Sequence, residues 1–258
     1  MKVGIVGKGN AGTALASALN ACDLAPTWWW SRRDETEPAL LAEVDTILIA
    51  VADRAIADVA RELAQRESAT REVWLHLSGF HEGSLCRVNP ESPRAAGSFH
   101  PLCALSAGSN ASQTLHGCVA GIDGEPLAVS VANNLADRLR MKAVLIPPGS
   151  KALYHASAVT VAGHVTALFD RAAKTLRHCG FDELTARSSL LALMRSAVEN
   201  LEIGPPSEVL TGPIARGDIH VSARHIEALV EVDPILGRVY SDLAAFADEL
   251  MHAKDSRR

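Results

Sequence analysis

Short apolar runs alternate with longer stretches of helical spacing along the first half of the chain. Runs of this length, bounded by turn residues, are typical of buried strands, whereas the stretches between them favour amphipathic helices. The expected strands are Lys2–Val6, Thr27–Trp30, Thr46–Val51, Val73–Leu77, Gly97–Phe99, Cys118–Ile122 and Ala143–Ile146. The expected helices between them are Gly12–Cys22, Arg54–Arg66, Glu82–Val88 and Glu125–Arg140. This alternation predicts an α/β fold with a doubly wound, mostly parallel sheet.

The alternation ends at Pro147-Pro148-Gly149, and no convincing strand follows it. Ser150 is placed to cap a helix that runs from Lys151 to about Cys179, and Gly180 supplies a left-handed stop. Further helices are expected at Asp182–Leu201, Ser222–Val232 and Pro234–Ala253, around a loop from Gly204 to Asp218. The sequence therefore predicts two domains, residues 1–147 with the sheet and residues 148–258 with helices only.

The composition is that of a globular protein. Of the 258 residues 48% are hydrophobic, which is enough for a core. A formal net charge of -5 without a dense Lys/Arg cluster argues against a nucleic-acid partner. No apolar run approaches the roughly 20 residues of a membrane span, and nothing before Gly7 resembles a signal peptide. We expect a cytoplasmic protein with no membrane partner.

The first strand runs directly into a glycine-rich turn, Gly7 to Gly12, which an alanine-rich helical stretch follows. A G-x-G-x-x-G turn between a strand and a helix is the pattern of dinucleotide-binding Rossmann domains. There the first glycine allows the tight turn, the second lets the backbone approach a pyrophosphate, and the third lets the helix pack against the sheet. The candidate phosphate-binding residues are Gly7, Gly9, Asn10, Ala11 and Gly12. The alternative is a purely structural glycine turn.

The end of the second strand distinguishes the two nicotinamide cofactors. An acidic residue there binds a ribose hydroxyl of NAD, whereas arginine accommodates the 2′-phosphate of NADP. In this chain Ser31, Arg32 and Arg33 follow the strand. Two guanidinium groups and a hydroxyl suit a phosphate dianion, so we predict NADP rather than NAD. Alternatively, the two arginines are surface residues that pair with Asp34 and Glu35.

The ends of the third and fourth strands are also expected at the ligand crevice of a doubly wound sheet. Ala50, Val51 and Ala52 follow the third strand and would contact the cofactor mainly by shape. Ser78 follows the fourth strand and can offer a hydroxyl to the cofactor, or it can serve as a cap.

Two places carry candidate chemistry for a proton transfer. His100 ends the fifth strand on the crevice side, and histidine exchanges protons near neutral pH. Lys151, Tyr154 and His155 share one face in the first turns of the long helix. A lysine, a phenol and an imidazole on one face can bind a carboxylate and move a proton. The alternatives are a backbone-bonded histidine and ordinary surface residues.

A third candidate is the loop from Thr211 to Asp218, which combines two glycines, a proline, a hydroxyl and an Arg/Asp pair. Thr211 and Arg216 can bind an anionic substrate, or Arg216 can pair with Asp218 and hold the loop. No histidine pair has the spacing of a metal site, and the five scattered cysteines form no C-x-x-C pair.

Several motifs together resemble a family of bacterial Rossmann-like proteins whose C-terminal helical domain is of uncharacterised function. The motifs are the Gly7–Gly12 turn, Ser31–Arg33, Leu77–Gly79, Ser98–Leu102, Tyr154–Ala156 and Thr211–Asp218. The layout is more distantly similar to pyrroline-5-carboxylate reductase, ketopantoate reductase, prephenate dehydrogenase and the deazaflavin-dependent NADP oxidoreductases. His100-Pro101 looks like the His-Pro pair of prephenate dehydrogenases, but Leu102-Cys103-Ala104 departs from the Met-Ala-Gly usual there. The resemblance implies a homodimer joined through the helical domain.

The leading hypothesis is an NADP-dependent oxidoreductase that transfers a hydride between the nicotinamide and a small, anionic carbonyl or imine compound in the interdomain cleft. His100, Lys151 or His155 would supply the proton, and Tyr154, Thr211 and Arg216 would bind the substrate. One alternative is a dinucleotide-binding sensor or regulatory protein that catalyses nothing. Another is a deazaflavin-linked NADP oxidoreductase.

Overall fold

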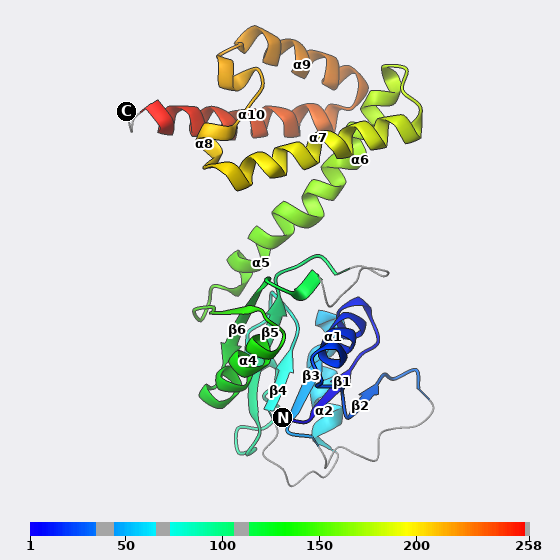
Figure 1. Ribbon diagram of the computed structural model, residues 1–258, viewed down its shortest axis with the longest axis vertical. Coiled ribbons are helices and arrows are strands. Elements are labelled where there is room, and N and C mark those ends of the chain that lie inside the picture. The colour runs from blue at the N-terminus through cyan, green and yellow to red at the C-terminus, as the bar shows by residue number, and fades with distance from the viewer. Residues whose placement is uncertain (35–43, 66–72, 106–113, 256–258) are drawn as a thin grey trace. The chain divides into compact units, whose positions relative to one another are not determined.

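The computed structural model describes residues 1–34, 44–65, 73–105 and 114–255. The chain forms two compact units, Met1–Thr160 and Val161–Arg258, and each is considered by itself (Figure 1). The units divide within the long helix rather than at residues 147 and 148, where the sequence places the domain boundary. The helix begins inside the first unit because its first residue, Lys151, is buried there.

A seven-stranded sheet forms the centre of the first unit, with strand order β2-β1-β3-β4-β5-β6-β7. The strands are β1 (Val3–Val6), β2 (Trp28–Trp30), β3 (Thr46–Ile49), β4 (Val73–His76), β5 (Ala95–Pro101), β6 (Val119–Gly124) and β7 (Lys142–Leu145). Neighbouring strands are parallel except for β5 and β6. The prediction of a doubly wound, mostly parallel sheet is confirmed, and all seven expected strands are present. The order reverses between β1 and β3, which is where such sheets bind ligands.

Helices cover both faces of this sheet. α1 (Asn10–Ala21) and α4 (Pro126–Arg138) pack on one face, against side chains such as Ile5 and Leu75 (Figure 1). α2 (Ile56–Ala64) packs on the other face, with Ile47 and Trp74. Successive strand residues point to opposite faces, so two-sided burial explains why the strands are apolar at nearly every position.

The predicted helix Glu82–Val88 is wrong. The segment forms only a short 3₁₀-helix, η3 (Gly83–Cys86). Gly83 packs so closely on β5 that an added Cβ would lie 2.6 Å from the Gly97 Cα. The Gly83 N–H donates to the Asp123 carboxylate at 3.1 Å. Gly83 is thus fixed against the sheet by these two contacts. A longer helix over this segment would not keep them.

The long helix after Pro147-Pro148 is continuous but not uniform. It consists of α5 (Lys151–Val159), one π-helical turn η4 (Thr160–His164), and α6 (Val165–His178). Gly180 has φ +89° and ends it, as expected. Ser150 stands at the N-cap, but its side chain makes no capping hydrogen bond, contrary to the expectation.

The described residues of the second unit form helices and the turns between them. Besides α6 it has α7 (Glu183–Ile203), α8 (Pro206–Val209), η5 (Ile214–Arg216), α9 (Ile219–Val232) and α10 (Pro234–Asp255). The expected loop Gly204–Asp218 thus includes two short helical turns. α6 packs against α7, and α9 against α10. Among the described residues of this unit, Ala186 and Leu236 are the only buried hydrophobic side chains.

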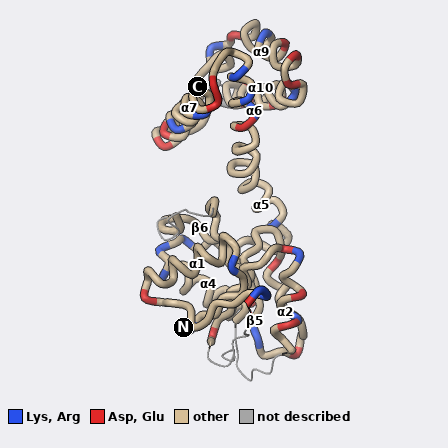
Figure 2. Tube along the Cα trace, turned by 90° about the vertical axis from the view of Figure 1, so that its right-hand side faces the viewer, with Lys and Arg blue, Asp and Glu red and all other residues tan. Residues whose placement is uncertain are grey.

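Within the described chain, the helix Lys151–His178 is long and apolar enough, by length and composition alone, to cross a membrane, and an 18-residue window of it has a mean hydropathy of 1.2. The expectation that no apolar run approaches the length of a membrane span does not hold for this helix. From Ala152 to Phe169 this helix carries no Lys, Arg, Asp or Glu, and the stretch is drawn tan in Figure 2. Charges return near its end at Asp170, Arg171 and Lys174.

Candidate functional site

The turn between β1 and α1 has the geometry that its glycines allow. Gly7 has φ +114°, and a Cβ there would lie 2.1 Å from the Ala50 carbonyl oxygen. A Cβ on Gly12 would lie 2.2 Å from the Gly7 carbonyl oxygen. Both positions therefore require glycine, because β3 and α1 pack directly on the turn.

Gly9 differs from its neighbours, because a Cβ added to it would meet nothing within 4 Å. The fold itself therefore does not demand glycine at this position. A dinucleotide-binding turn uses the second glycine to bring its backbone close to the pyrophosphate. Gly9 is the N-cap of α1, and the N–H groups of Asn10 and Ala11 belong to the first turn, which favours an anion.

A hollow of about 280 Å³ adjoins this turn at the carboxyl ends of β1 and β2. Its lining residues are Val6, Gly7, Lys8, Gly9, Ser31, Arg32, Arg33, Val51, Ala55 and Val59. The structure thus brings the glycine turn and the Ser31–Arg33 segment to one cavity. The residues fit a dinucleotide whose phosphates lie at Gly9 and whose 2′-phosphate lies at the arginines.

The charges at this hollow are partly paired. Arg32 binds Glu62 of α2, with its Nε and a terminal nitrogen 3.0 and 2.8 Å from Oε2. Asp34 binds the Lys8 ammonium at 2.8 Å and accepts from the Ser31 N–H, and the bond to Lys8 is the largest cause that lowers the pKa of this carboxyl.

The alternative pairing of the two arginines with Asp34 and Glu35 is therefore wrong for Asp34, while Glu35 lies outside the described residues. In the described part of the chain, no carboxylate pairs with Arg33. Of the cations that line this hollow, Lys8 and Arg32 are paired with carboxylates, so Arg33 is the one that is available to pair with a ligand.

Other residues expected at the crevice have mixed roles. Val51 lines the hollow and Ala50 is buried beneath the glycine turn, whereas Ala52 is exposed and begins the 3₁₀-helix η2 (Asp53–Ala55). The Ser78 hydroxyl accepts from the N–H groups of Phe80 and His81, at 3.1 Å each. These bonds hold a turn after β4 and not the start of a helix, because the N-cap of η3 is Glu82, so the helix-cap alternative is wrong for Ser78.

His100, Tyr154 and His155 form a cluster at the carboxyl end of β5. His100 Nδ1 and the Tyr154 hydroxyl are 2.7 Å apart. The two imidazole rings lie edge to face, with centroids 5.6 Å apart. His155 Nδ1 is buried and has no hydrogen-bond partner among the described residues. Buried polar atoms are normally satisfied, so this unpartnered nitrogen is available to a ligand.

The tautomer of His100 decides which group donates in its bond with Tyr154. When the Tyr154 hydroxyl donates to Nδ1, the ring proton of His100 lies on Nε2. Burial, followed by the charge of Lys151, lowers the pKa of His100 to about 4. Burial raises the pKa of Tyr154 to about 12. At neutral pH both groups are therefore uncharged, and in this tautomer His100 presents an N–H donor.

Lys151 lies deeper than the sequence indicates. The residue is 1% exposed, and its ammonium donates to Ser98 Oγ at 2.9 Å and to the Ser78 carbonyl at 3.2 Å. Burial lowers the pKa of Lys151, and the charge of Asp123 is the largest opposing cause. With its described bonds directed at protein oxygens, Lys151 is a structural cation beside the cluster.

Sequence analysis missed four residues that shape this cluster. Gly79 and Gly121 leave space for it, because a Cβ on Gly79 would lie 2.5 Å from His155 Nδ1, and one on Gly121 would lie 2.5 Å from the Tyr154 hydroxyl. Ser98 and Asp123 bind Lys151 directly or through one hydroxyl. A carboxylate inside an apolar strand was the available signal for Asp123, since such groups are rarely buried without a partner.

Thr211 and Arg216 belong to the second unit, so their relation to the cluster is a prediction. Arg216 Nε binds Asp218 Oδ2 at 2.9 Å, as the alternative reading of this loop expects. Gly212 and Gly217 have φ +98° and +74°, which fixes the shape of the loop.

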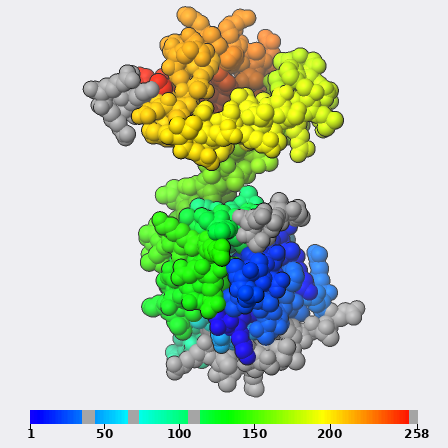
Figure 3. Space-filling view, in the orientation of Figure 1, coloured from blue at the N-terminus to red at the C-terminus, as the bar shows by residue number. Residues whose placement is uncertain are grey.

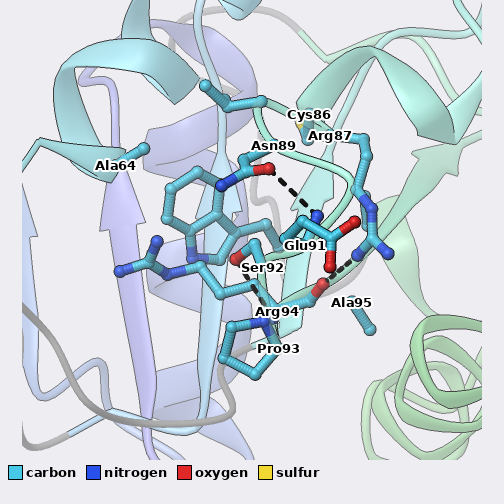
Figure 4. A pocket seen from close by; sticks show the side chains of 12 residues that line it. Ala64, Cys86, Arg87, Asn89, Glu91, Ser92, Pro93, Arg94 and Ala95 are labelled. Carbon is cyan, nitrogen blue, oxygen red and sulfur yellow. Dashed lines mark hydrogen bonds between the residues drawn. The ribbon is translucent and has the colours of Figure 1, made fainter.

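A second hollow of about 280 Å³ lies at the amino ends of β4 and β5 (Figure 4). Here the Arg94 guanidinium stacks over the Trp74 ring, 5.0 Å from its centroid. Arg87 donates to the Arg94 carbonyl and to Glu125. These arginines are engaged by the protein itself, and the hollow is at the sheet edge opposite the glycine turn.

The family model described as "Domain of unknown function (DUF2520)" matches residues 118–246. Among curated protein sequences, none matches this chain.

Solved structures share the fold over nearly the whole chain. The protein TM1727 of Thermotoga maritima superimposes with a TM-score of 0.75 at 20% identity, covering 99% of this chain and 100% of that one. A candidate NADP oxidoreductase of Bacteroides fragilis gives 0.75 at 20% identity, with 96% and 98% covered. The pyrroline carboxylate reductase of Plasmodium falciparum, solved with NADP bound, gives 0.62 at 12% identity, with 97% and 98% covered.

Proposed function

The chain belongs to the DUF2520 family, and from that premise we propose that it is an NADP-dependent oxidoreductase acting on a small, anionic carbonyl or imine compound. The observation that carries the proposal is the hollow that joins the glycine turn to Ser31, Arg32 and Arg33. Its fold neighbours include proteins named as an NADP oxidoreductase and as a pyrroline carboxylate reductase with NADP. These names agree with the cofactor that the arginines favour.

The nicotinamide supplies or accepts the hydride when it is bound. The protein's own contribution begins at the row of strand ends from β1 to β5. Adjacent strands are ~4.8 Å apart, so the glycine turn and His100 are separated by about 14 Å along the sheet edge. A dinucleotide bound at the turn can thus extend along this edge toward the cluster.

His100 is the group best placed to assist the reaction. Its Nε2–H can donate a hydrogen bond or a proton to the carbonyl oxygen or imine nitrogen, while Tyr154 holds the other ring nitrogen. A neutral imidazole is a competent electrophile in such a role. His155 Nδ1, which has no partner in the described chain, is available to the same ligand.

Cofactor binding is the first test. Trp29 is a natural reporter, because its indole Nε1 donates to the Gly7 carbonyl at 2.9 Å and the ring is partly exposed. Titration followed by tryptophan fluorescence is expected to show tighter binding of NADPH than of NADH. Absence of binding by either cofactor would mean that the glycine turn is structural and would overturn the proposed function.

Selectivity is expected to depend on Arg33. Arg33→Ala should weaken NADPH binding by roughly 10- to 100-fold, the cost of losing one charged hydrogen-bonding partner, and leave NADH binding unchanged. Arg32→Ala is the matched control and should have a smaller effect, because Glu62 already holds this guanidinium. Equal losses for NADPH and NADH in the Arg32→Ala, Arg33→Ala double variant would refute the NADP assignment.

We also propose that the protein is a cytoplasmic homodimer joined through the helical unit. Large apolar side chains of this unit are exposed, among them Leu184 at 79%, Ile203 at 81% and Ile219 at 78%. α7, which carries two of them, is the yellow band of Figure 3. A unit that buries so little apolar surface gains too little hydrophobic stabilisation to be stable as a monomer. A second copy of the chain would bury the exposed apolar side chains at an interface.

The dimer is tested by light scattering after size exclusion over a wide protein concentration range. We expect twice the chain mass of 27.4 kDa at all but the lowest concentrations. Ile203→Asp should shift the equilibrium toward monomer, whereas Leu145→Asp, at an exposed site of β7, should not. A monomer throughout, or flotation of the protein with lipid vesicles, would contradict the proposal.

A further inference from the structure

A chain of buried polar side chains crosses the interior of the first unit beside His100. The Lys151 ammonium donates to Ser98 Oγ at 2.9 Å, and Ser98 Oγ donates to Oδ1 of Asp123. Oδ2 of Asp123 accepts from the Gly83 N–H at 3.1 Å. The exposed fractions of Lys151, Ser98 and Asp123 are 1%, 0% and 5%. A cation and an anion are thus joined through one hydroxyl, away from water.

The sheet and the long helix build this connection from three separate elements. The antiparallel register of β5 and β6 places Ser98 opposite Asp123, so their side chains lie on the same face. Lys151 is the first residue of α5 and reaches the pair from the helix start. Because β6 runs antiparallel to β5, Asp123 near the carboxyl end of β6 lies level with Ser98, two residues before His100.

The two charges depend on each other. A buried ammonium loses its hydration and stays charged only when an anion compensates it. Removing one partner of such a pair leaves the other charge uncompensated. Asp123 is the largest of the nearby negative charges that oppose the lowering of the Lys151 pKa.

The position of Lys151 also affects where Tyr154 and His155 lie and how His100 titrates. Tyr154 and His155 lie one turn after Lys151 on the same face of α5. The Lys151 ammonium is 5.9 Å from the centre of the Tyr154 ring. Its charge is, after burial, the largest cause that keeps the pKa of His100 low.

We propose that Asp123 is a positioning residue for the His100–Tyr154 pair: through Ser98 it keeps Lys151 charged and fixed, and Lys151 anchors the first turn of α5. The proposal rests on the proposed function for its effect on turnover, but not for the ion pair itself. Asp123 has no contact with His100, so it acts only through its neighbours.

Several elements carry charged or titratable groups that interact electrostatically with Lys151. They are Asp123 of β6, Glu82 before η3, Asp53 of η2, His76 of β4, and His100 of β5. Glu82 also accepts from the Gly149 N–H at 3.0 Å, so its substitution would disturb the helix start directly. Asp123 is therefore the cleaner position for a test.

The first experiment follows the titration of Lys151 by NMR in protein with ¹³C-labelled lysine, with Lys151→Met to identify its signal. In Asp123→Asn the titration midpoint of Lys151 is expected about one pH unit lower or more, because the compensating charge is gone. Ser98→Ala keeps both charges and should shift it in the same direction by less. Asp58→Asn, at an exposed carboxylate of α2, should leave it unchanged. An unchanged midpoint in both Asp123→Asn and Ser98→Ala would overturn the proposal.

A double-mutant cycle tests the pairing independently. Asp123→Asn and Lys151→Met should each lower the urea midpoint, because each leaves one buried charge. The double variant should be more stable than either single variant, because no unpaired charge remains. Losses that simply add would show that the two residues act separately and would overturn the proposal.

The effect on turnover separates positioning from a merely structural role. Asp123→Asn is expected to lower kcat by about 10²-fold, as misplacement of a reacting group does, with unchanged NADPH affinity. Unchanged kcat, or loss of cofactor binding with it, would refute a positioning role. If the unaltered protein binds no NADPH, the proposed function fails, whereas the NMR titration and the cycle still decide the ion pair.

Discussion

His100→Ala is expected to lower kcat by about 10²- to 10⁴-fold, the usual contribution of a positioned acid or base. NADPH affinity should be unchanged, because the variant removes nothing from the hollow at the glycine turn. The reason is that His100 combines a neutral imidazole, held at Nδ1 by its bond with Tyr154, and a place at the carboxyl edge of the sheet. Steady-state kinetics with a panel of carbonyl and imine compounds measures kcat, and fluorescence titration measures affinity.

The chain offers a matched control for this variant. His225 and Tyr240 form a second histidine–tyrosine pair in the helical unit, with Nδ1 2.9 Å from the hydroxyl, and neither residue lines either of the two hollows of the first unit. His225→Ala should therefore keep full turnover. Tyr154→Phe removes only the hydroxyl that holds His100. Its kcat should lie between those of His100→Ala and His225→Ala. Full turnover in His100→Ala would refute its role, and no turnover by the unaltered protein with any compound would favour the sensor alternative.

Acidification is expected to destabilise the first unit through His76. This side chain is fully buried, with Nδ1 accepting from the Ser78 N–H and Nε2 bonded to the Glu82 carbonyl. Burial lowers its pKa from 6.5 to about 4. Between these values the unfolded chain binds the proton and the folded chain does not, so stability is complete above pH 6.5 and falls as the pH drops toward 4. The loss is roughly 3 kcal/mol.

Urea unfolding at a series of pH values measures this effect. Tryptophan fluorescence is the appropriate signal, because all four tryptophans lie in the first unit. His76→Gln should reduce the dependence of unfolding free energy on pH between 4 and 6.5, leaving the part due to His100. His178→Gln, at an exposed position, should behave like the unaltered protein. An unchanged pH dependence in His76→Gln would contradict the assignment.

The sequence alone determined the architecture of the first unit. Strands buried on both faces are continuous apolar runs, and the glycines of a tight turn have fixed spacing, so both features are local and visible in the chain. The same is true of the second unit, where helical periodicity and Gly180 predicted the helices and the end of α6. The candidates His100, Tyr154 and His155 were found because strand ends and helix faces follow from these elements.

Only the tertiary structure shows which partner each charged side chain has. Arg32 and Arg33 are adjacent and chemically alike, and only the packing of α2 against β2 shows that Glu62 holds the first of them. The sequence left Lys151 as a candidate proton donor or a surface residue, because a lysine carries no sign of burial. The pairing of β5 with β6 supplies Ser98 and Asp123 to receive it. Contacts between distant segments depend on register and packing, which a single sequence does not encode in any local pattern.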